Sequence, residues 1–319
     1  MKPFAFVFPG QGSQAVGMLD GWGDHPAVAH TLEEASNALG QDIGLMIRQG
    51  SKEDLALTTN TQPVMLVAGV AAYRAWMAEV GVAPAYVAGH SLGEYTALVA
   101  SGALTLTQAA PLVRLRAQAM QNAVPVGAGA MAAILGLDAT KVIAACAHIT
   151  RATAQYDLEI NDVVEAVNFN DPMQTVIAGS KAAVDKACEH LKAEGAKRAV
   201  LLQVSAPFHS SLMWPAADKL REKLADTSFL PLRIPLINNI DVTLETDVAR
   251  IRDALYRQAF GAVRWVECIQ AIKSRGVMHV VECGPGKVLA GLVKRIDADM
   301  TGAALFDPAS MAQVKELLV

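Results

Sequence analysis

The sequence has few of the features that mark secreted or membrane proteins. Its first apolar run, residues 4–8, ends at Pro9-Gly10 and is too short for the core of a signal peptide. The apolar run at 64–73 is about half as long as a membrane-spanning helix needs to be. We therefore expect a cytoplasmic protein that does not associate with a membrane.

Cysteine is also scarce, with only Cys146, Cys188, Cys268 and Cys283 in the chain. None of them forms a Cys-x-x-Cys pair or another spacing typical of metal ligands. Such isolated residues are typical of reduced thiols in a cytosolic protein. We expect neither a disulfide framework nor a metal site.

Neither positively nor negatively charged residues are in large excess. The chain has 27 Lys and Arg residues against 31 Asp and Glu residues, and its formal net charge is -4. It therefore lacks the basic bias of a protein that binds nucleic acid, and a small substrate is favoured over a polyanion. A length of 319 residues, 52% of them hydrophobic, predicts a large domain plus a smaller one.

Short apolar, β-branched runs alternate with longer segments of helical periodicity. This alternation predicts an α/β domain with a largely parallel sheet. The strand candidates lie at 4–8, 85–88, 234–237 and 278–283, and the helix candidates at 26–39, 63–80 and 95–100. In such sheets, functional sites lie at the carboxyl ends of the strands.

A second pattern follows the Gly-rich passage at 123–129. Strand, helix, strand, strand, helix and strand candidates come in order at 130–137, 139–147, 163–169, 175–178, 181–194 and 199–204. This order is typical of a split βαβ, ferredoxin-like fold. We predict a small ferredoxin-like α+β domain at 128–205, inserted into a discontinuous catalytic α/β domain of hydrolase-like type at 1–127 and 206–319.

A Gly-x-Ser-x-Gly motif lies where a strand candidate meets a helix candidate, at Gly89-His90-Ser91-Leu92-Gly93. A serine on such a tight turn projects above the sheet at a helix N-terminus, as in a nucleophile elbow. The alternative is that Ser91 only caps the helix, because Glu94 three residues later completes a capping-box pattern. The strand and the two glycines favour the nucleophile.

A serine hydroxyl needs a base within hydrogen-bond reach. Of the seven histidines, His209 lies in a loop directly after the chain returns to the large domain, which makes it the favoured base. His90 adjoins Ser91, but side chains of neighbouring residues diverge at an elbow, so we expect it to pack or to orient the turn. The remaining five lie in segments typical of helices, of exposed surface or of an apolar strand. They are His25, His30, His148, His190 and His279.

An oxyanion hole needs backbone N–H groups directed at the developing negative charge. The first donor is usually the residue after the nucleophile, here Leu92. The Gly-rich loop at 8–13 offers Gln11 as the second, unless the loop is an ordinary turn at a strand end. Gly10-Gln11-Gly12 does not complete the GxGxxG pattern of a nucleotide-binding loop.

Five segments together resemble the malonyl-CoA:acyl carrier protein transacylases of bacterial fatty acid synthesis. The similarity runs in order from about residue 4 to residue 295. The segments are FPGQGSQ at 8–14, GHSLGEY at 89–95, LRAQAM at 115–120, PFHS at 207–210 and ECGPGKVL at 282–289.

The resemblance implies that Ser91 takes the malonyl group from CoA and passes it to the phosphopantetheine thiol of acyl carrier protein. His209 would act as base and acid, with the backbone carbonyl of Gln258 as its orienting partner. Malonyl-CoA and acyl carrier protein would be the substrate and the partner, with no tightly bound cofactor. The basic residues considered for carrier docking are Lys181, Lys287, Lys294 and Arg295.

The same resemblance gives Arg116 a role in acyl selection. By sequence alone Arg116 is typical of a helix surface, but the family match implies that its guanidinium pairs with the malonyl carboxylate. Gln62 would help to fix the acyl group, and Phe208 would narrow the pocket against a methyl branch. Arg114, two residues away, lies on another helix face and serves as a control.

Other functions are compatible with parts of the pattern. A serine esterase or thioesterase would need a carboxylate between Ser91 and His209, for which Asp162, Asp171 and Asp185 are the candidates. A polyketide-pathway malonyltransferase and a non-catalytic acyl-carrier-binding module are further alternatives. The sequence also differs from the usual family pattern in two places, at Asp171-Pro172-Met173 and in a long polar stretch at 150–162.

Overall fold

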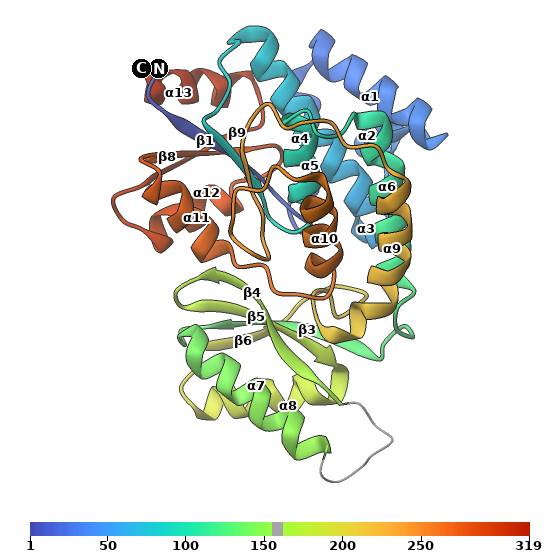
Figure 1. Cartoon of the computed structure of the whole chain (residues 1–319), viewed down its shortest axis with the longest axis vertical. Coiled ribbons are helices and arrows are strands. Elements are labelled where there is room, and N and C mark those ends of the chain that lie inside the picture. Colours follow the sequence, from blue (N-terminus) through green and yellow to red (C-terminus); the bar gives the residue numbers. More distant parts are fainter. Residues whose placement is uncertain (155–161) are drawn as a thin grey trace.

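The computed structural model describes residues 1–154 and 162–319. In these residues the chain forms two β-sheets, each with its own helices (Figure 1). The polar stretch at 150–162 falls mostly outside the described residues.

The first sheet is parallel and has the strand order β7-β2-β1-β8-β9. In β1 all five side chains are buried, as expected for a central parallel strand covered on both faces. Phe4, Phe6 and Phe8 pack on one side of the sheet, and Ala5 and Val7 on the other. The strands are β1 (Phe4–Phe8), β2 (Tyr86–Gly89), β7 (Leu236–Ile237), β8 (His279–Cys283) and β9 (Thr301–Leu305).

Helices cover both faces of this sheet. The phenylalanine face packs in one large cluster against α4, α5 and α6 and the helices around them, whereas the opposite face packs against α11 and α12. The described part of the chain contains no helix that is both long and apolar enough to cross a membrane. The helices are η1 (Asp20–Trp22), α1 (Pro26–Leu39), α2 (Ile43–Gln49), α3 (Lys52–Ala56), α4 (Thr58–Glu79), α5 (Gly93–Ala100), α6 (Leu106–Gln121), η2 (Ser211–Met213), α9 (Trp214–Asp226), α10 (Val248–Gln258), α11 (Trp265–Ser274), α12 (Val288–Ile296) and α13 (Pro308–Leu318).

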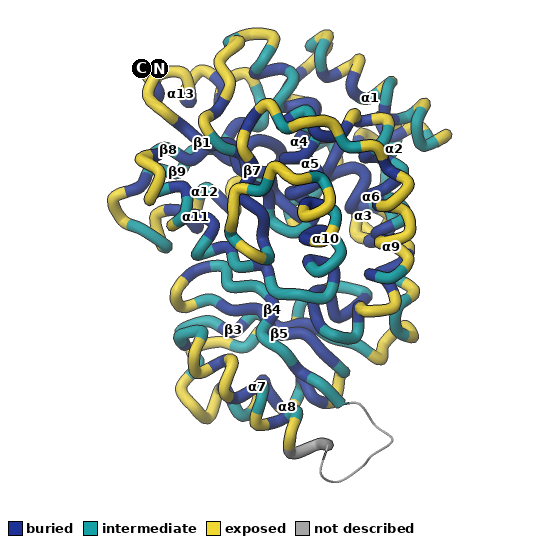
Figure 2. Tube along the Cα trace, in the orientation of Figure 1, coloured by how far each residue is buried: buried dark blue, intermediate teal, exposed yellow. Residues whose placement is uncertain are grey.

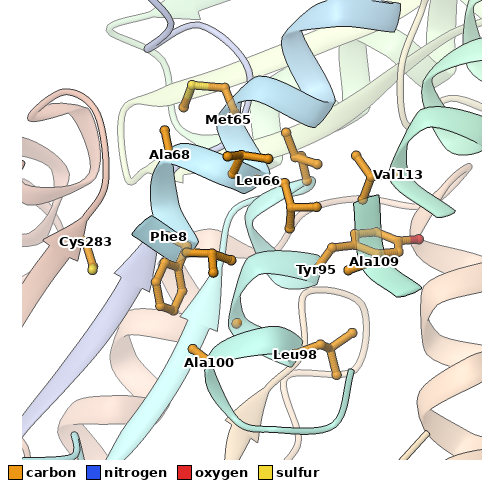
Figure 3. Packing of buried hydrophobic residues seen from close by; sticks show 14 of the residues in the cluster. Phe8, Met65, Leu66, Ala68, Tyr95, Leu98, Ala100, Ala109, Val113 and Cys283 are labelled. Atoms are coloured by element: carbon orange, nitrogen blue, oxygen red, sulfur yellow. The ribbon is translucent and has the colours of Figure 1, made fainter. Parts of the chain in front are cut away.

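Figure 3 shows the centre of the larger core. Phe8 from β1, Leu66 from α4, Leu98 from α5 and Val113 from α6 belong to the same cluster of buried residues. Figure 2 shows buried residues running through β1, α4 and α5, with exposed residues on the outer helices. The Gly-x-Ser-x-Gly turn lies between β2 and α5, and both of these elements are largely buried.

The second sheet is antiparallel, with the strand order β4-β5-β3-β6. Helices α7 and α8 cover one face and form a separate core with it. The order of these elements along the chain is that of the predicted ferredoxin-like unit, so the predicted fold class is confirmed. The elements are β3 (Gly129–Leu135), α7 (Ala139–Ala154), β4 (Val164–Asp171), β5 (Gln174–Ser180), α8 (Lys181–Ala193) and β6 (Arg198–Leu201).

The other face of this sheet packs on the larger part of the protein. Met131, Val176 and Ala178 join the large core cluster. The two parts also exchange backbone hydrogen bonds, from the Val263 N–H to the Val167 carbonyl at 2.8 Å and from the Phe169 N–H to the Val263 carbonyl at 3.0 Å. We propose a division into domains at 1–127 plus 206–319 and at 128–205, supported by the separate sheets.

Some element boundaries differ from the predicted ones. The strand predicted at 199–204 ends at Leu201, because the chain turns away from the sheet where the Val204 N–H donates to the Leu202 carbonyl. The strand predicted at 234–237 is reduced to Leu236–Ile237, directly after Pro235, which has no N–H to donate. The edge strand β9, with the sequence TGAAL, was not predicted, because Gly and Ala have low β-propensity.

Candidate active site

The Gly-x-Ser-x-Gly motif forms a sharp turn between β2 and α5. Ser91 has a φ of 53°, in the left-handed region that L-residues rarely occupy. A Cβ on Gly89 would lie 1.9 Å from the Gly93 carbonyl carbon, and one on Gly93 would lie 2.0 Å from the Phe8 carbonyl oxygen. Both flanking positions therefore require glycine to allow this close approach of backbone segments.

Ser91 does not cap α5. The helix begins at Gly93 after Leu92, and it has no side-chain cap hydrogen bond. The carboxylate of Glu94 instead accepts hydrogen bonds from the Asn239 N–H and from Gln258. The helix-cap alternative is therefore wrong, and the Ser91 hydroxyl is available for other partners.

His209 is the partner of Ser91. Its Nε2 lies 2.7 Å from the Ser91 Oγ, and its Nδ1 lies 2.8 Å from the backbone carbonyl oxygen of Gln258. Because a carbonyl only accepts hydrogen bonds, Nδ1 carries the proton and Nε2 is left to accept the Ser91 O–H. Burial, followed by the nearby Arg116 guanidinium, lowers the pKa of His209 from 6.5 to about 3, so the imidazole is neutral near pH 7.

The carboxylates considered for a hydrolase triad are bonded elsewhere. Asp162 accepts a hydrogen bond from the Ser180 hydroxyl, Asp185 pairs with Lys181, and Asp171 pairs with Arg295. The position that a triad carboxylate would occupy at Nδ1 is taken by the Gln258 carbonyl. The geometry is that of a Ser-His pair oriented by a backbone carbonyl.

Arg116 is buried beside this pair instead of lying on the helix surface. It is 2% exposed, and its guanidinium lies over the Tyr95 ring. Its Nη2 donates to the Ser91 Oγ at 3.2 Å and to the Gln258 Oε1 at 3.1 Å, and its Nη1 donates to the Gln62 Oε1 at 2.6 Å. The structure therefore places a cation within reach of any group carried on Ser91.

The two expected oxyanion donors lie close to Ser91. Gln11 and Leu92 both line the pocket around the serine. Within the described residues, neither backbone N–H has a hydrogen-bond acceptor. The side chain of Gln11 is held by Thr58, at 3.2 Å, which fixes the loop after β1.

The pocket at Ser91 is small, with a volume of about 100 Å³. Pockets for drug-sized ligands measure roughly 300–1,000 Å³, so this one suits a short group. Phe208 and Gln62 contribute to its wall, together with Met120 and Met131. A larger hollow of about 710 Å³ is lined by α1, α2 and the loop around η1, and none of the predicted site residues lines it.

The histidine beside the serine has a different role. The Nε2 of His90 lies 2.8 Å from the Asn170 Oδ1, and its ring packs against Trp265. Burial lowers its pKa. His90 therefore connects the elbow to β4 of the second sheet, as a packing and orienting residue.

Sequence reasoning missed Asn239. Its Oδ1 accepts the Ser91 N–H at 2.8 Å, and its Nδ2 donates to the Gly89 carbonyl at 2.7 Å. The available signal was its place two residues after β7, because polar residues at the carboxyl end of a parallel strand often reach the site. Glu94 was noticed only as a possible capping residue.

Comparison with known proteins agrees with this geometry. Residues 5–305 match the model of the acyl transferase domain family. The chain is 49% identical to the malonyl CoA-acyl carrier protein transacylase of Escherichia coli (strain K12), over 99% of this chain and 100% of that protein. The chain belongs to the malonyl CoA-acyl carrier protein transacylase family.

Solved members of the transacylase family share the whole fold. The acyl-carrier-protein S-malonyltransferase from Burkholderia pseudomallei 1710b is 61% identical and superposes with a TM-score of 0.94, covering 99% of this chain and 100% of that one. A malonyl-transacylase solved in complex with a type II PKS acyl-carrier protein is 46% identical, with a TM-score of 0.94 over 99% and 100% of the two chains.

Proposed function

We propose that the protein transfers a malonyl group from CoA to acyl carrier protein through an ester on Ser91, for fatty acid synthesis. One observation carries the proposal: the Ser91 Oγ lies 2.7 Å from the Nε2 of a neutral His209 and 3.2 Å from the Nη2 of Arg116. A nucleophile, its base and a cation for a carboxylate thus meet at one oxygen. Membership of the transacylase family supports the same reaction.

In the first half-reaction the Ser91 Oγ attacks the thioester carbonyl carbon of malonyl-CoA, and its proton passes to the Nε2 of His209. The C–S bond then breaks, His209 gives the proton to the CoA sulfur, and a malonyl ester remains on Ser91. In the second half-reaction the phosphopantetheine thiol gives its proton to His209 and attacks the ester. The C–O bond breaks and Ser91 recovers its proton.

The backbone N–H groups of Gln11 and Leu92 would hold the negative oxygen in both steps. Donors that are already in place stabilise the tetrahedral intermediate without reorganisation, and removing one such donor typically slows a reaction by roughly 10²–10³. The placement of both residues at the pocket beside Ser91 supports this assignment.

Arg116 would select malonyl by pairing with its free carboxylate. A buried carboxylate is costly without a partner, and hydrogen bonds to charged groups contribute roughly 1.5–3 kcal/mol each. Gln62 would hold Arg116 in place through its 2.6 Å hydrogen bond. Phe208, in the pocket wall beside His209, would exclude a methyl branch on the acyl chain.

Acyl carrier protein would dock near α12. Lys287, Lys294 and Arg295 are exposed there, and Arg295 reaches Asp171 at the end of β4, so this cationic edge borders both sheets. Lys181 lies on α8 and is paired with Asp185. We place the reaction in the cytoplasm, with malonyl-CoA as a substrate and no tightly bound cofactor.

A transfer assay tests this function. The protein is incubated with malonyl-CoA and phosphopantetheinylated acyl carrier protein, and malonyl-carrier and free malonate are measured by mass spectrometry. We expect malonyl-carrier as the main product. Free malonate as the main product would identify a hydrolase, and carrier binding without any reaction would identify a binding module.

A further inference from the structure

The buried carboxylate of Glu94 lies close to the Ser-His pair and takes no part in the proposed reaction. Glu94 is 2% exposed and stands in the first turn of α5, three residues after Ser91. Its Oε2 accepts the Asn239 N–H at 2.9 Å and the Gln258 Nε2 at 3.0 Å. Burial of a carboxylate is costly, and two donors offset that cost here.

Both partners of Glu94 contact the reacting residues. The Asn239 Oδ1 accepts the N–H of Ser91. The Gln258 Nε2 also donates to the Ser91 carbonyl at 3.0 Å, while the Gln258 backbone carbonyl accepts from His209. Glu94 is thus connected to both members of the pair through one intermediate residue.

The Gln258 amide has one orientation that satisfies its surroundings. Its Oε1 accepts a hydrogen bond from the Arg116 Nη2 at 3.1 Å, and its Nε2 donates to the Glu94 carboxylate. Rotating the amide by half a turn would set its nitrogen against the guanidinium and its oxygen against the carboxylate. A donor would then face a donor, and an acceptor would face an acceptor. The Glu94 carboxylate is the charged acceptor that favours the observed orientation, together with the Ser91 carbonyl.

We propose that Glu94 is a positioning residue for acyl selection: it orients the Gln258 amide, which in turn holds Arg116 where a malonyl carboxylate binds. The inference rests on the proposed function. Glu94 touches neither substrate nor reacting atoms in this role. Its effect therefore appears in the preference for malonyl over uncharged acyl groups.

Protonation of Glu94 gives the proposal a second readout. Burial raises the pKa of Glu94 from 4.5 to about 7, opposed by the Asn239 and Gln258 hydrogen bonds and by Arg116. The ionisable groups around it are Arg116 from α6, Asp241 after β7, Cys268 from α11 and the adjacent Tyr95. Above about pH 7 the ionised form makes the stronger, charge-assisted hydrogen bonds. His209, with a pKa of about 3, does not titrate in this range.

The experiment measures formation of the malonyl-enzyme from malonyl-CoA by rapid quench, from about pH 5 to about pH 9, and the ratio of kcat/KM for malonyl-CoA and acetyl-CoA. Only the first half-reaction is followed, so ionisation of the carrier thiol does not contribute. For the wild type we expect the rate to fall as the pH drops through about 7.

Two variants separate the orienting role from general support of the fold. Glu94→Ala removes the charged acceptor of the Gln258 amide, which is then held only by the Ser91 carbonyl and Arg116, so the malonyl-to-acetyl ratio should fall about tenfold or more. Glu94→Gln keeps an acceptor for both donors, so it should restore most of the ratio while removing the rate change near pH 7. A purely structural role would lower stability and leave the ratio unchanged.

Glu282 provides a matched control. It is fully buried, burial raises its pKa to about 7, and its Oε2 accepts the Ala290 N–H at the start of α12, outside the site. A raised carboxyl pKa means that the folded state binds more protons between about pH 4.5 and 7, so the unfolding free energy falls as the pH rises through that window. Glu94→Gln and Glu282→Gln should both flatten this dependence. Only Glu94→Gln should change the rate profile.

An unchanged malonyl-to-acetyl ratio in folded Glu94→Ala would overturn the proposal, and so would a rate change near pH 7 that persists in Glu94→Gln. Failure of the proposed function is a separate result, since the wild type would then form no malonyl-enzyme.

Discussion

Backbone strain in this protein is concentrated at Ser91 and His209, the proposed nucleophile and base. In the described residues three non-glycine positions have a positive φ, and two of them are Ser91, at 53°, and His209, at 66°. Such conformations cost of order 1–3 kcal/mol each and persist only where the surroundings hold them. Here Asn239 holds the Ser91 N–H and the Gln258 carbonyl holds the His209 ring.

Substitution of the pair tests their roles. Ser91→Ala removes the nucleophile and should abolish the malonyl-enzyme. His209→Ala removes the base and should slow its formation by roughly 10²–10⁴. Rapid-quench mass spectrometry measures both. Ser274→Ala, at an exposed serine on α11, should react like the wild type, and full activity of either site variant would contradict the mechanism.

Substitution of Arg116 tests acyl selection directly. Arg116→Ala should lower the kcat/KM ratio of malonyl-CoA to acetyl-CoA by about tenfold to a hundredfold, because the malonyl carboxylate loses its charged partner. Arg114→Ala is the control, since Arg114 bonds Gln41 outside the pocket. Equal ratios in the two variants would show that Arg116 does not bind the acyl carboxylate.

At the scale of residues, motif context was enough to single out Ser91 and His209. Arg116 needed the family resemblance, because nothing in a helical pattern indicates that an arginine is buried. Asn239 was indicated only by its place near a strand end, and its contacts with Ser91 and Glu94 depend on which segments distant in sequence come together. Asn239 lies 148 residues from Ser91 along the chain.

At the scale of elements, the close contact of the elbow with β1 explains its two glycines. Gly93→Ala would place a Cβ 2.0 Å from the Phe8 carbonyl oxygen, so the backbone must shift. We expect a loss of about 1–3 kcal/mol or more in unfolding free energy, together with lower activity.

Gly291 in α12 is the control for this change. It is exposed, and a Cβ there would meet nothing within 4 Å. Gly291→Ala should stabilise the protein by about 0.5–1 kcal/mol, because alanine loses less conformational freedom in a helix. Denaturant unfolding measures both variants, and similar losses in both would contradict the packing argument at Gly93.

The sequence pattern also predicted every strand of the two sheets except β9. Strand β1 was recognisable because its FAFVF run is apolar throughout, and α1 because its apolar residues repeat with helical spacing. Strand β9 was not recognisable from the sequence, because its small residues form a strand only through pairing with β8. Boundaries at turns, such as the end of β6, depended on tertiary contacts.

At the scale of the whole molecule, the site lies where the two sheets meet. Ser91 and Leu92 follow β2 and Gln11 follows β1 of the parallel sheet, and Met131 and Asn168 of the second sheet complete the pocket. The large core cluster also includes residues from both. A shared core and a shared site make independent unfolding of the smaller part unfavourable.

We therefore expect one cooperative unfolding transition. All four tryptophans, Trp22, Trp76, Trp214 and Trp265, lie outside 128–205, so their fluorescence reports on the larger part, whereas far-UV circular dichroism reports on both. The two denaturation curves should coincide. A separate transition seen only by circular dichroism would show that the smaller part unfolds alone.

The central claim is that Ser91 carries the malonyl group between CoA and acyl carrier protein. Its most direct test is peptide mapping of the protein after incubation with malonyl-CoA, before and after addition of phosphopantetheinylated acyl carrier protein. We expect a malonyl ester on Ser91 that disappears as malonyl-carrier forms. A malonyl group on another residue, or an ester on Ser91 that the carrier does not remove, would contradict it.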